Sequence, residues 1–98
     1  MSTVTGMIGN IKCGGLIIGS VGKWKFAMKE EPLEVSVDSY YLNQYWYVQG
    51  QVLELWLKCG KGFWVIESKI QGFPCVGKQI DSRIKFESVN PPHYISQN

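Results

Sequence analysis

The sequence has few charged residues. Asp, Glu, Lys and Arg make up 18% of its 98 residues, below the roughly 25% of an average soluble domain. Ten basic and eight acidic side chains leave a formal net charge of +2. The pI of about 8.4 lies below the value of about 9 that marks a nucleic-acid-binding domain. Charge alone therefore identifies no partner.

Histidine and paired cysteines are also scarce. Nucleophilic catalysis by Ser or Cys usually needs a histidine base, and the single histidine, His93, follows two prolines with no nucleophile motif beside it. Cys13, Cys59 and Cys75 include no Cys-x2-4-Cys pair of the kind that zinc sites use. We therefore predict no enzymatic activity, no metal and no cofactor, and thiols that pack as small apolar groups in a reducing compartment.

Long apolar runs and phosphate-binding motifs are missing as well. The longest apolar runs, such as Leu16 to Ile18 and Tyr45 to Val48, are far shorter than the roughly 18 residues that cross a bilayer. Neither Gly-x-Gly-x-x-Gly nor Gly-x4-Gly-Lys-Ser/Thr occurs. We therefore predict no membrane segment and no nucleotide-binding loop of these types.

Apolar and aromatic side chains are abundant. They account for 45% and 13% of the residues, respectively, in a chain long enough for one core. A domain of this size buries only about two-thirds of its unfolded surface. So much apolar side chain in a small domain favours an interface with other protein chains.

Alternation with a period of two, typical of half-buried strands, dominates the pattern. Trp24 to Met28 and Leu33 to Val37 alternate on either side of an acidic turn that contains Pro32, which predicts a hairpin. Leu53 to Cys59 and Phe63 to Ile66 flank Gly60-Lys61-Gly62, which predicts a second hairpin.

Two further segments predict strands, although the start of the chain is less regular. Ile8 to Cys13 and Leu16 to Ile18 flank two glycines and predict a short hairpin, with a bulge or bend at Gly19 and Gly22. Residues 80–88 show the cleanest alternation in the chain. No long amphipathic helix is evident.

The expected fold is therefore all-β: a single antiparallel β-sandwich or small barrel of about six or seven strands. We expect it to occupy residues 1–90, followed by a C-terminal tail or arm at residues 91–98. The predicted core comprises alternating apolar residues of these strands: Trp24, Phe26, Leu33, Val35, Leu55, Ile84 and Phe86.

Residues 39–51 fit neither period and are compatible with a strand, a helical turn or an ordered loop. The segment is rich in aromatics, which give large contact areas at protein interfaces. Two interpretations are open: it contacts another subunit, or it folds back over the core. The candidate interface residues are Tyr40, Tyr41, Tyr45, Trp46 and Tyr47.

A second function class fits the glycine hairpin. Trp56, Phe63 and Trp64 lie beside Lys58 and Lys61. On an OB-like barrel, such residues would form a stacking platform with a basic rim for single-stranded nucleic acid. Aromatic residues in strands are more often core residues, so this is an alternative to a structural role.

Residues 14–26 read Gly-Gly-Leu-Ile-Ile-Gly-Ser-Val-Gly-Lys-Trp-Lys-Phe, and residues 30–36 read Glu-Glu-Pro-Leu-Glu-Val-Ser. This stretch resembles the opening of tailed-bacteriophage tail tube proteins, in which a strand leads through a glycine to a short Trp-containing strand, an acidic turn and a Leu-x-Val strand. Residues 70–87 resemble the last two strands of that family and their connecting loop.

The resemblance implies a β-sandwich subunit that assembles with itself and with other virion proteins into rings stacked as a tube, through which DNA passes without specific binding. It also implies a location in the virion after assembly in the host cytoplasm. The chain is short for the family, shows no helix between its halves and has a last strand of mixed charge. Related roles, such as a tail-terminating, head-joining or decorating subunit, therefore stay open.

Overall fold

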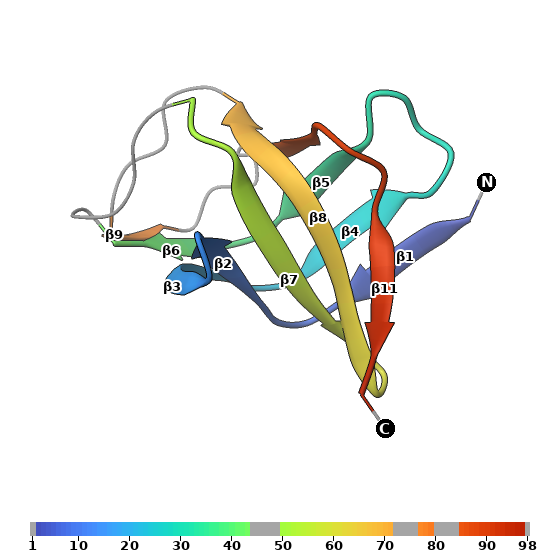
Figure 1. Cartoon of the computed structure of the whole chain (residues 1–98), viewed down its shortest axis with the longest axis horizontal. Helices are drawn as coiled ribbons and strands as arrows, with labels where there is room; N and C mark the ends of the chain where they lie inside the picture. The colour runs from blue at the N-terminus through green and yellow to red at the C-terminus, as the bar shows by residue number, and fades with distance from the viewer. Residues whose placement is uncertain (1, 44–49, 72–76, 80–84, 98) are drawn as a thin grey trace.

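The computed structural model describes residues 2–43, 50–71, 77–79 and 85–97, and every regular element among them is a β-strand. All strand pairs are antiparallel, as the sequence predicts, and they belong to one sheet (Figure 1). None of these residues forms a helix with the length and apolar character of a bilayer crossing. The strands are β1 (Thr3–Gly6), β2 (Gly9–Cys13), β3 (Leu16–Val21), β4 (Trp24–Ala27), β5 (Glu34–Val37), β6 (Tyr40–Leu42), β7 (Leu53–Cys59), β8 (Gly62–Gln71), β9 (Gly77–Gln79), β10 (Lys85–Ser88) and β11 (His93–Ser96).

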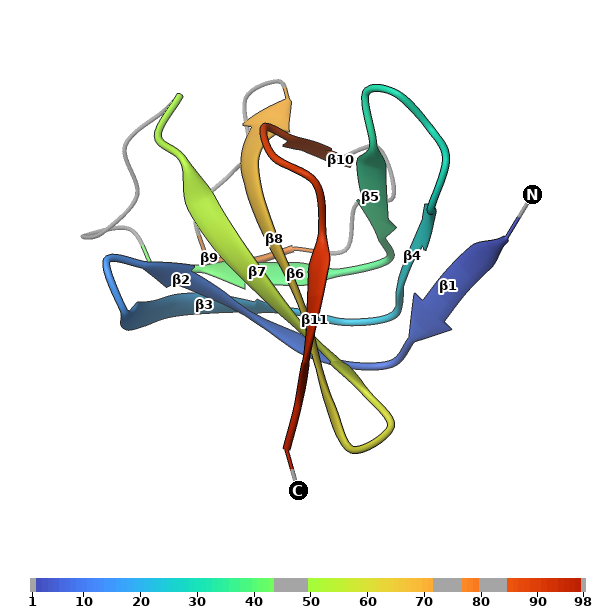
Figure 2. The ribbon, with the colours of Figure 1, turned by 45° about the vertical axis from the view of Figure 1, so that its right-hand side comes forward.

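The sheet curls back on itself, so that strands from both halves of the chain face a common interior (Figures 1 and 2). Its strand order is β1-β4-β5-β10-β8-β7-β2-β3-β6-β9, and β11 pairs with β8 beside β10. The longest strand, β8, pairs with β7 along one edge and with β10 and then β11 along the other. This long strand therefore joins the two halves of the sheet.

The described strands number eleven, more than the six or seven expected: bends divide three long strands into pairs, and the C-terminal segment adds β11. Residues 7–8, 22–23 and 38–39 separate β1 from β2, β3 from β4 and β5 from β6. Close packing at the second of these bends requires glycine at Gly22, since a Cβ there would overlap the side chains of Ser39 and Asp38. The Gly22 amide donates to the Ser39 carbonyl at 2.9 Å, which holds two bends together.

All three predicted hairpins are present. Leu53 to Cys59 pairs along its length with β8, β4 pairs with β5, and β2 pairs with β3 across a glycine turn. Gly14 and Gly15 both have positive φ, the conformation that a tight two-residue hairpin turn needs. The register of β2 and β3 shifts between Ile11 and Lys12, opposite Gly19, which is the predicted bulge.

The core forms where the apolar positions of the strands converge. The predicted core residues Trp24, Phe26, Leu33, Val35, Leu55 and Phe86 are all buried, and Ile84 lies outside the described residues. The polar atom of the buried Trp24 ring is hydrogen-bonded, because the indole Nε1 donates to the Ile8 carbonyl at 2.9 Å. The period of two thus identified the inner face of the sheet correctly.

The C-terminal segment folds onto the sheet as an arm. His93 to Ser96 forms β11, whose residues face Gly62 to Val65 of β8. The Gln97 amide donates to the Lys61 carbonyl at 2.8 Å and extends this pairing. Asn90, Pro91 and Pro92 connect the arm to β10, so β10 and β11 lie one after the other along the same edge of β8.

Candidate subunit and nucleic-acid interfaces

The predicted tyrosine-rich interface segment is only partly within the described residues. Tyr40 and Tyr41 lie on β6, next to β3, whereas Tyr45, Trp46 and Tyr47 lie outside the described residues. The side chain of Tyr40 is 3% exposed and belongs to the core cluster, while that of Tyr41 is 43% exposed. The alternation along β6 therefore leaves Tyr41 at the surface and places Tyr40 in the core.

Three strands of the described part of the sheet have a partner on one side only. There, β1 pairs with β4 alone, β9 with β6 alone and β11 with β8 alone. Such strands present backbone N–H and C=O groups to which a strand of another chain can pair. Exposed apolar side chains accompany two of these edges: Met7 and Ile8 directly follow β1, and Tyr94 and Ile95 lie within β11.

A cluster of aromatic and basic side chains occupies the outer face of β2, β7 and β8. Trp56 and Phe63 are half-buried and meet edge to face, with their ring centroids 5.7 Å apart. Lys12 Nζ lies 3.9 Å from the centroid of the Trp56 ring, and Lys58 Nζ lies 5.0 Å from that of Phe63. We call Lys12, Trp56, Lys58 and Phe63 the aromatic–basic cluster.

Antiparallel pairing explains this arrangement, because residues directly opposite one another share a face. Lys58 faces Phe63 across β7 and β8. Val65 faces Trp56 and is 3% exposed, yet it is not part of the interior core cluster. The rings therefore cover a small hydrophobic patch on the outside of the sheet. Glu54, on the same strand, accepts a hydrogen bond from Trp56 Nε1 at 3.2 Å.

Trp64, which the sequence grouped with Trp56 and Phe63, lies on the opposite face. It contacts Phe26 edge to face at 5.6 Å and Tyr94 at 5.4 Å between ring centroids. Phe26 in turn stacks on Trp24 at 5.8 Å. Trp64 therefore links the buried aromatic residues to the C-terminal arm, and this position corrects the prediction of a three-ring platform.

The remaining candidates for chemistry are dispersed. Cys13 and Cys59 are half-buried and pack against the core cluster, and Cys75 lies outside the described residues. His93 is exposed on β11. Among the residues that the structure describes, no three His, Cys, Asp or Glu side chains converge as metal ligands would.

Sequence reasoning missed Lys12 as a member of the aromatic–basic cluster. The pairing of β2 with β7 places Asn10 opposite Trp56 and Lys12 opposite Glu54. Nothing in the local sequence indicates that the first hairpin lies beside residues more than 40 positions later.

No protein-family model, curated protein or solved structure matches the chain, so its function is inferred from its own residues and geometry.

Proposed function

We propose that this chain is a structural subunit of a tailed-phage virion, of the tail-tube type or a related tail, head-joining or decorating type. Its partners are copies of itself and other virion proteins, and DNA passes the assembly without specific binding. The observation that carries the proposal is that two of the three one-sided strands, β1 and β11, are each accompanied by exposed apolar side chains. Such edges favour completion of the sheet by a neighbouring subunit.

The local layout of the first half supports the proposal. The segment that resembles tail tube proteins forms β3, a bend at Gly22, the short Trp-containing strand β4, a turn at residues 28–33 and then β5. This is the order of elements that the resemblance implies. Of the second resembling stretch, residues 72–76 and 80–84 lie outside the described residues.

The exposed side chains beside β1 provide a direct test. Met7 and Ile8 are 68% and 62% exposed, so replacing both with Lys removes no core contact. Lysine at a strand edge discourages pairing with another chain. We expect the wild type to have a mass, measured by light scattering, that is a multiple of 11.1 kDa. The M7K/I8K double variant should associate at least about tenfold more weakly, which corresponds to roughly 1.4 kcal/mol.

The matched control is Val52→Lys, which adds a lysine at an exposed apolar position away from β1. It should assemble as the wild type does. Both variants should retain the far-ultraviolet circular dichroism of a β-protein. A wild type that stays monomeric at high concentration, and that copurifies with no virion protein, would contradict the proposed function.

A second function is favoured by one observation, the aromatic–basic cluster. Its two rings and two ammonium groups lie together on an exposed sheet face, the combination that binds single-stranded nucleic acid by stacking and charge. This function predicts binding of a labelled oligothymidylate that weakens with salt. The W56A/F63A variant should lose it, since each stacked base contributes about 1–3 kcal/mol. Tyr41→Ala, on a different strand, is the control.

A further inference from the structure

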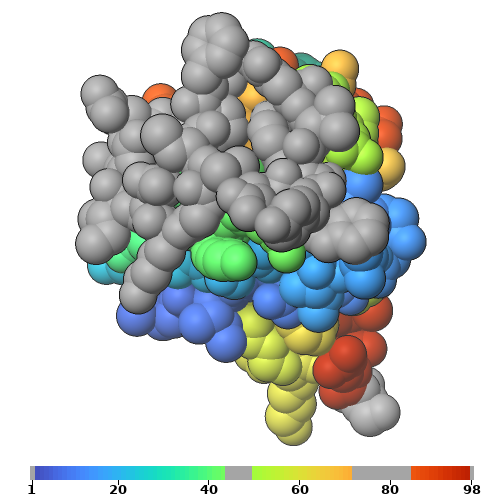
Figure 3. Space-filling model, turned by 90° about the vertical axis from the view of Figure 1, so that its left-hand side faces the viewer, coloured from blue at the N-terminus to red at the C-terminus, as the bar shows by residue number. Residues whose placement is uncertain are grey.

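The hairpin that joins β7 to β8 projects from one end of the molecule. Figure 3 shows it as the yellow segment at the bottom, beyond the body of the sheet. Its turn consists of Gly60 and Lys61, with Gly62 as the first residue of β8. Because glycines flank Lys61, the turn itself is narrow and carries one long side chain. We call residues 58–63 the hairpin tip.

The hairpin tip is basic. Lys58 and Lys61 are its charged residues, and residues 58–63 contain no acidic side chain. Within the described residues, neither lysine forms an ion pair with a carboxylate, since the salt bridge found there joins Lys85 to Glu34. The tip therefore presents two positive charges that no carboxylate of the described residues neutralises, and the Lys58 ammonium lies over the Phe63 ring.

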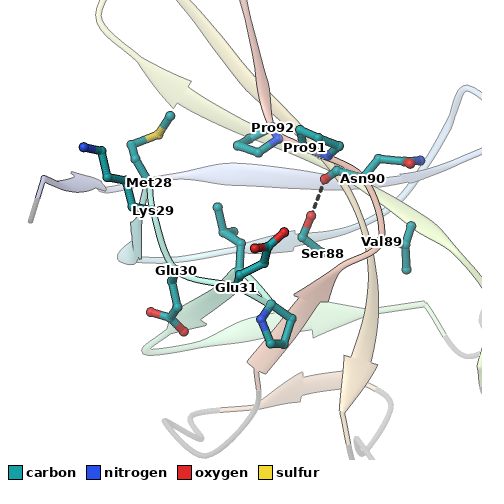
Figure 4. A pocket seen from close by; sticks show the side chains of 11 residues that line it. Met28, Lys29, Glu30, Glu31, Ser88, Val89, Asn90, Pro91 and Pro92 are labelled. Atoms are coloured by element: carbon teal, nitrogen blue, oxygen red, sulfur yellow. Dashed lines mark hydrogen bonds between the residues drawn. The ribbon is translucent and has the colours of Figure 1, made fainter.

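A groove lies at the opposite end of the molecule, between the β4–β5 loop and the β10–β11 connector. Both ribbon views place these segments at the upper end and the hairpin tip at the lower end (Figures 1 and 2). The groove has a volume of about 470 Å³. Figure 4 shows Met28 on one side and Val89, Pro91 and Pro92 on the other. The Ser88 hydroxyl donates to the Asn90 carbonyl and fixes the connector wall.

The groove is acidic where the tip is basic. Glu30 and Glu31 line it from the loop, and the Glu31 carboxylate lies toward the Ser88–Asn90 wall in Figure 4. Lys29 is the one cation among the lining residues, so they carry a net charge of −1. Neither glutamate pairs with a cation in the described part of the chain.

We propose that the hairpin tip of one copy docks into this acidic groove of the next copy, with Lys61 between the apolar walls and beside Glu31. The inference deepens the proposed structural role, on which it rests, by naming the surfaces that join neighbouring subunits. A contact between two different surfaces of identical chains is heterologous, and repeating it builds a ring or an open filament. The positions of tip and groove at opposite ends suit such a repeat.

Exposed apolar side chains at both ends support the second copy as the occupant. Met28 and Val89 border the groove, and both are exposed. Tyr94 and Ile95, also exposed, lie beside the tip, because β11 pairs with the first residues of β8. The Tyr94 hydroxyl donates to the Cys59 carbonyl at 2.7 Å and holds the arm against the hairpin. A docked pair therefore buries apolar surface around a central charge pair.

Charge reversal tests the proposal because it predicts a specific pattern of rescue. Lys61→Glu would bring two carboxylates together at the contact, and Glu31→Lys would bring two ammonium groups together there. Juxtaposed like charges strongly disfavour association, so each variant alone should associate at least about tenfold more weakly by analytical ultracentrifugation at low salt. An equimolar mixture of the two should assemble again, and so should the K61E/E31K double variant.

Lys23→Glu, which reverses an exposed lysine away from both surfaces, is the control and should assemble normally. Circular dichroism and thermal unfolding establish that each variant is folded. If the wild type assembles and the single variants assemble equally well, or if the mixture does not recover, tip-into-groove docking is wrong while the structural role stands. If the wild type never assembles, the proposed function itself fails.

Discussion

Lys12 and Trp56, separated by 44 positions in the sequence, form a cation–π contact in which the ammonium lies 3.9 Å from the ring centroid. This contact covers one face of the ring. A nucleic-acid base that stacks on that face must first displace the lysine. The geometry therefore favours a structural role for the Trp56 ring in the isolated chain and makes Lys12 the residue that controls access to it.

Replacing Lys12 with Ala should lower the free energy of unfolding by about 0.5–1 kcal/mol, the usual value of an exposed cation–π contact. It should also change the tryptophan fluorescence, because the environment of Trp56 changes. Urea denaturation with fluorescence detection measures both effects. Lys25→Ala, at an exposed position on β4, should alter neither, and a Lys12 variant identical to the wild type would contradict the contact.

Gly6 lies against the indole of Trp24, and a Cβ on Gly6 would overlap the ring. Because Trp24 is fully buried and its Nε1 is bonded to the Ile8 carbonyl, the ring has little room to move. Gly6→Ala should therefore destabilise the fold by about 1–3 kcal/mol, the usual effect of overpacking. Trp24→Ala should cost about 3–5 kcal/mol. Thermal unfolding measures both effects. The control is Thr5→Ala at an exposed neighbouring position, which should leave the stability unchanged.

Most of the fold could be predicted from the sequence, because alternation with a period of two directly identifies the buried side of each strand. The same rule applies to Phe63 and Trp64. Because neighbouring residues in a strand point to opposite faces, the two rings lie on opposite faces of the sheet. The bends that divide the long strands and the pairing of β2 with β7 depend on tertiary packing. The cluster around Lys12 therefore could not be derived from local pattern.

The sequence predicts a C-terminal tail or arm but not its pairing with β8. Pro91 and Pro92 end an alternating pattern, which usually marks the end of a fold. The pairing of β11 with β8 depends on a free edge of β8 beyond β10. Only the three-dimensional arrangement of the sheet shows that edge.

Ser68 is a polar side chain in the core. It is fully buried on β8, and its hydroxyl finds no hydrogen-bond partner within the described structure. A buried polar group without a partner destabilises a fold by about 1–3 kcal/mol. Ser68→Ala should therefore raise the free energy of unfolding by roughly 1 kcal/mol, measured by urea denaturation. Ser20→Ala at an exposed position is the control. A destabilised Ser68 variant would show that the hydroxyl is bonded.

Gly62 controls the docking of the C-terminal arm. A Cβ on this residue would overlap the Ile95 carbonyl and crowd the Tyr94 ring, so only glycine allows β11 to approach the start of β8. Gly62→Ala should therefore detach the arm, including the contact between the Tyr94 and Trp64 rings, while the core stays folded. Hydrogen exchange should show faster exchange at the Gln97 amide, which normally donates to the Lys61 carbonyl, and unchanged protection at Leu55.

The control is Lys61→Ala, which keeps the backbone pairing and should leave the arm protected. Should the arm stay protected in the Gly62 variant, the close approach of β11 to β8 is incorrect; should Leu55 lose protection as well, the arm is part of the cooperative core.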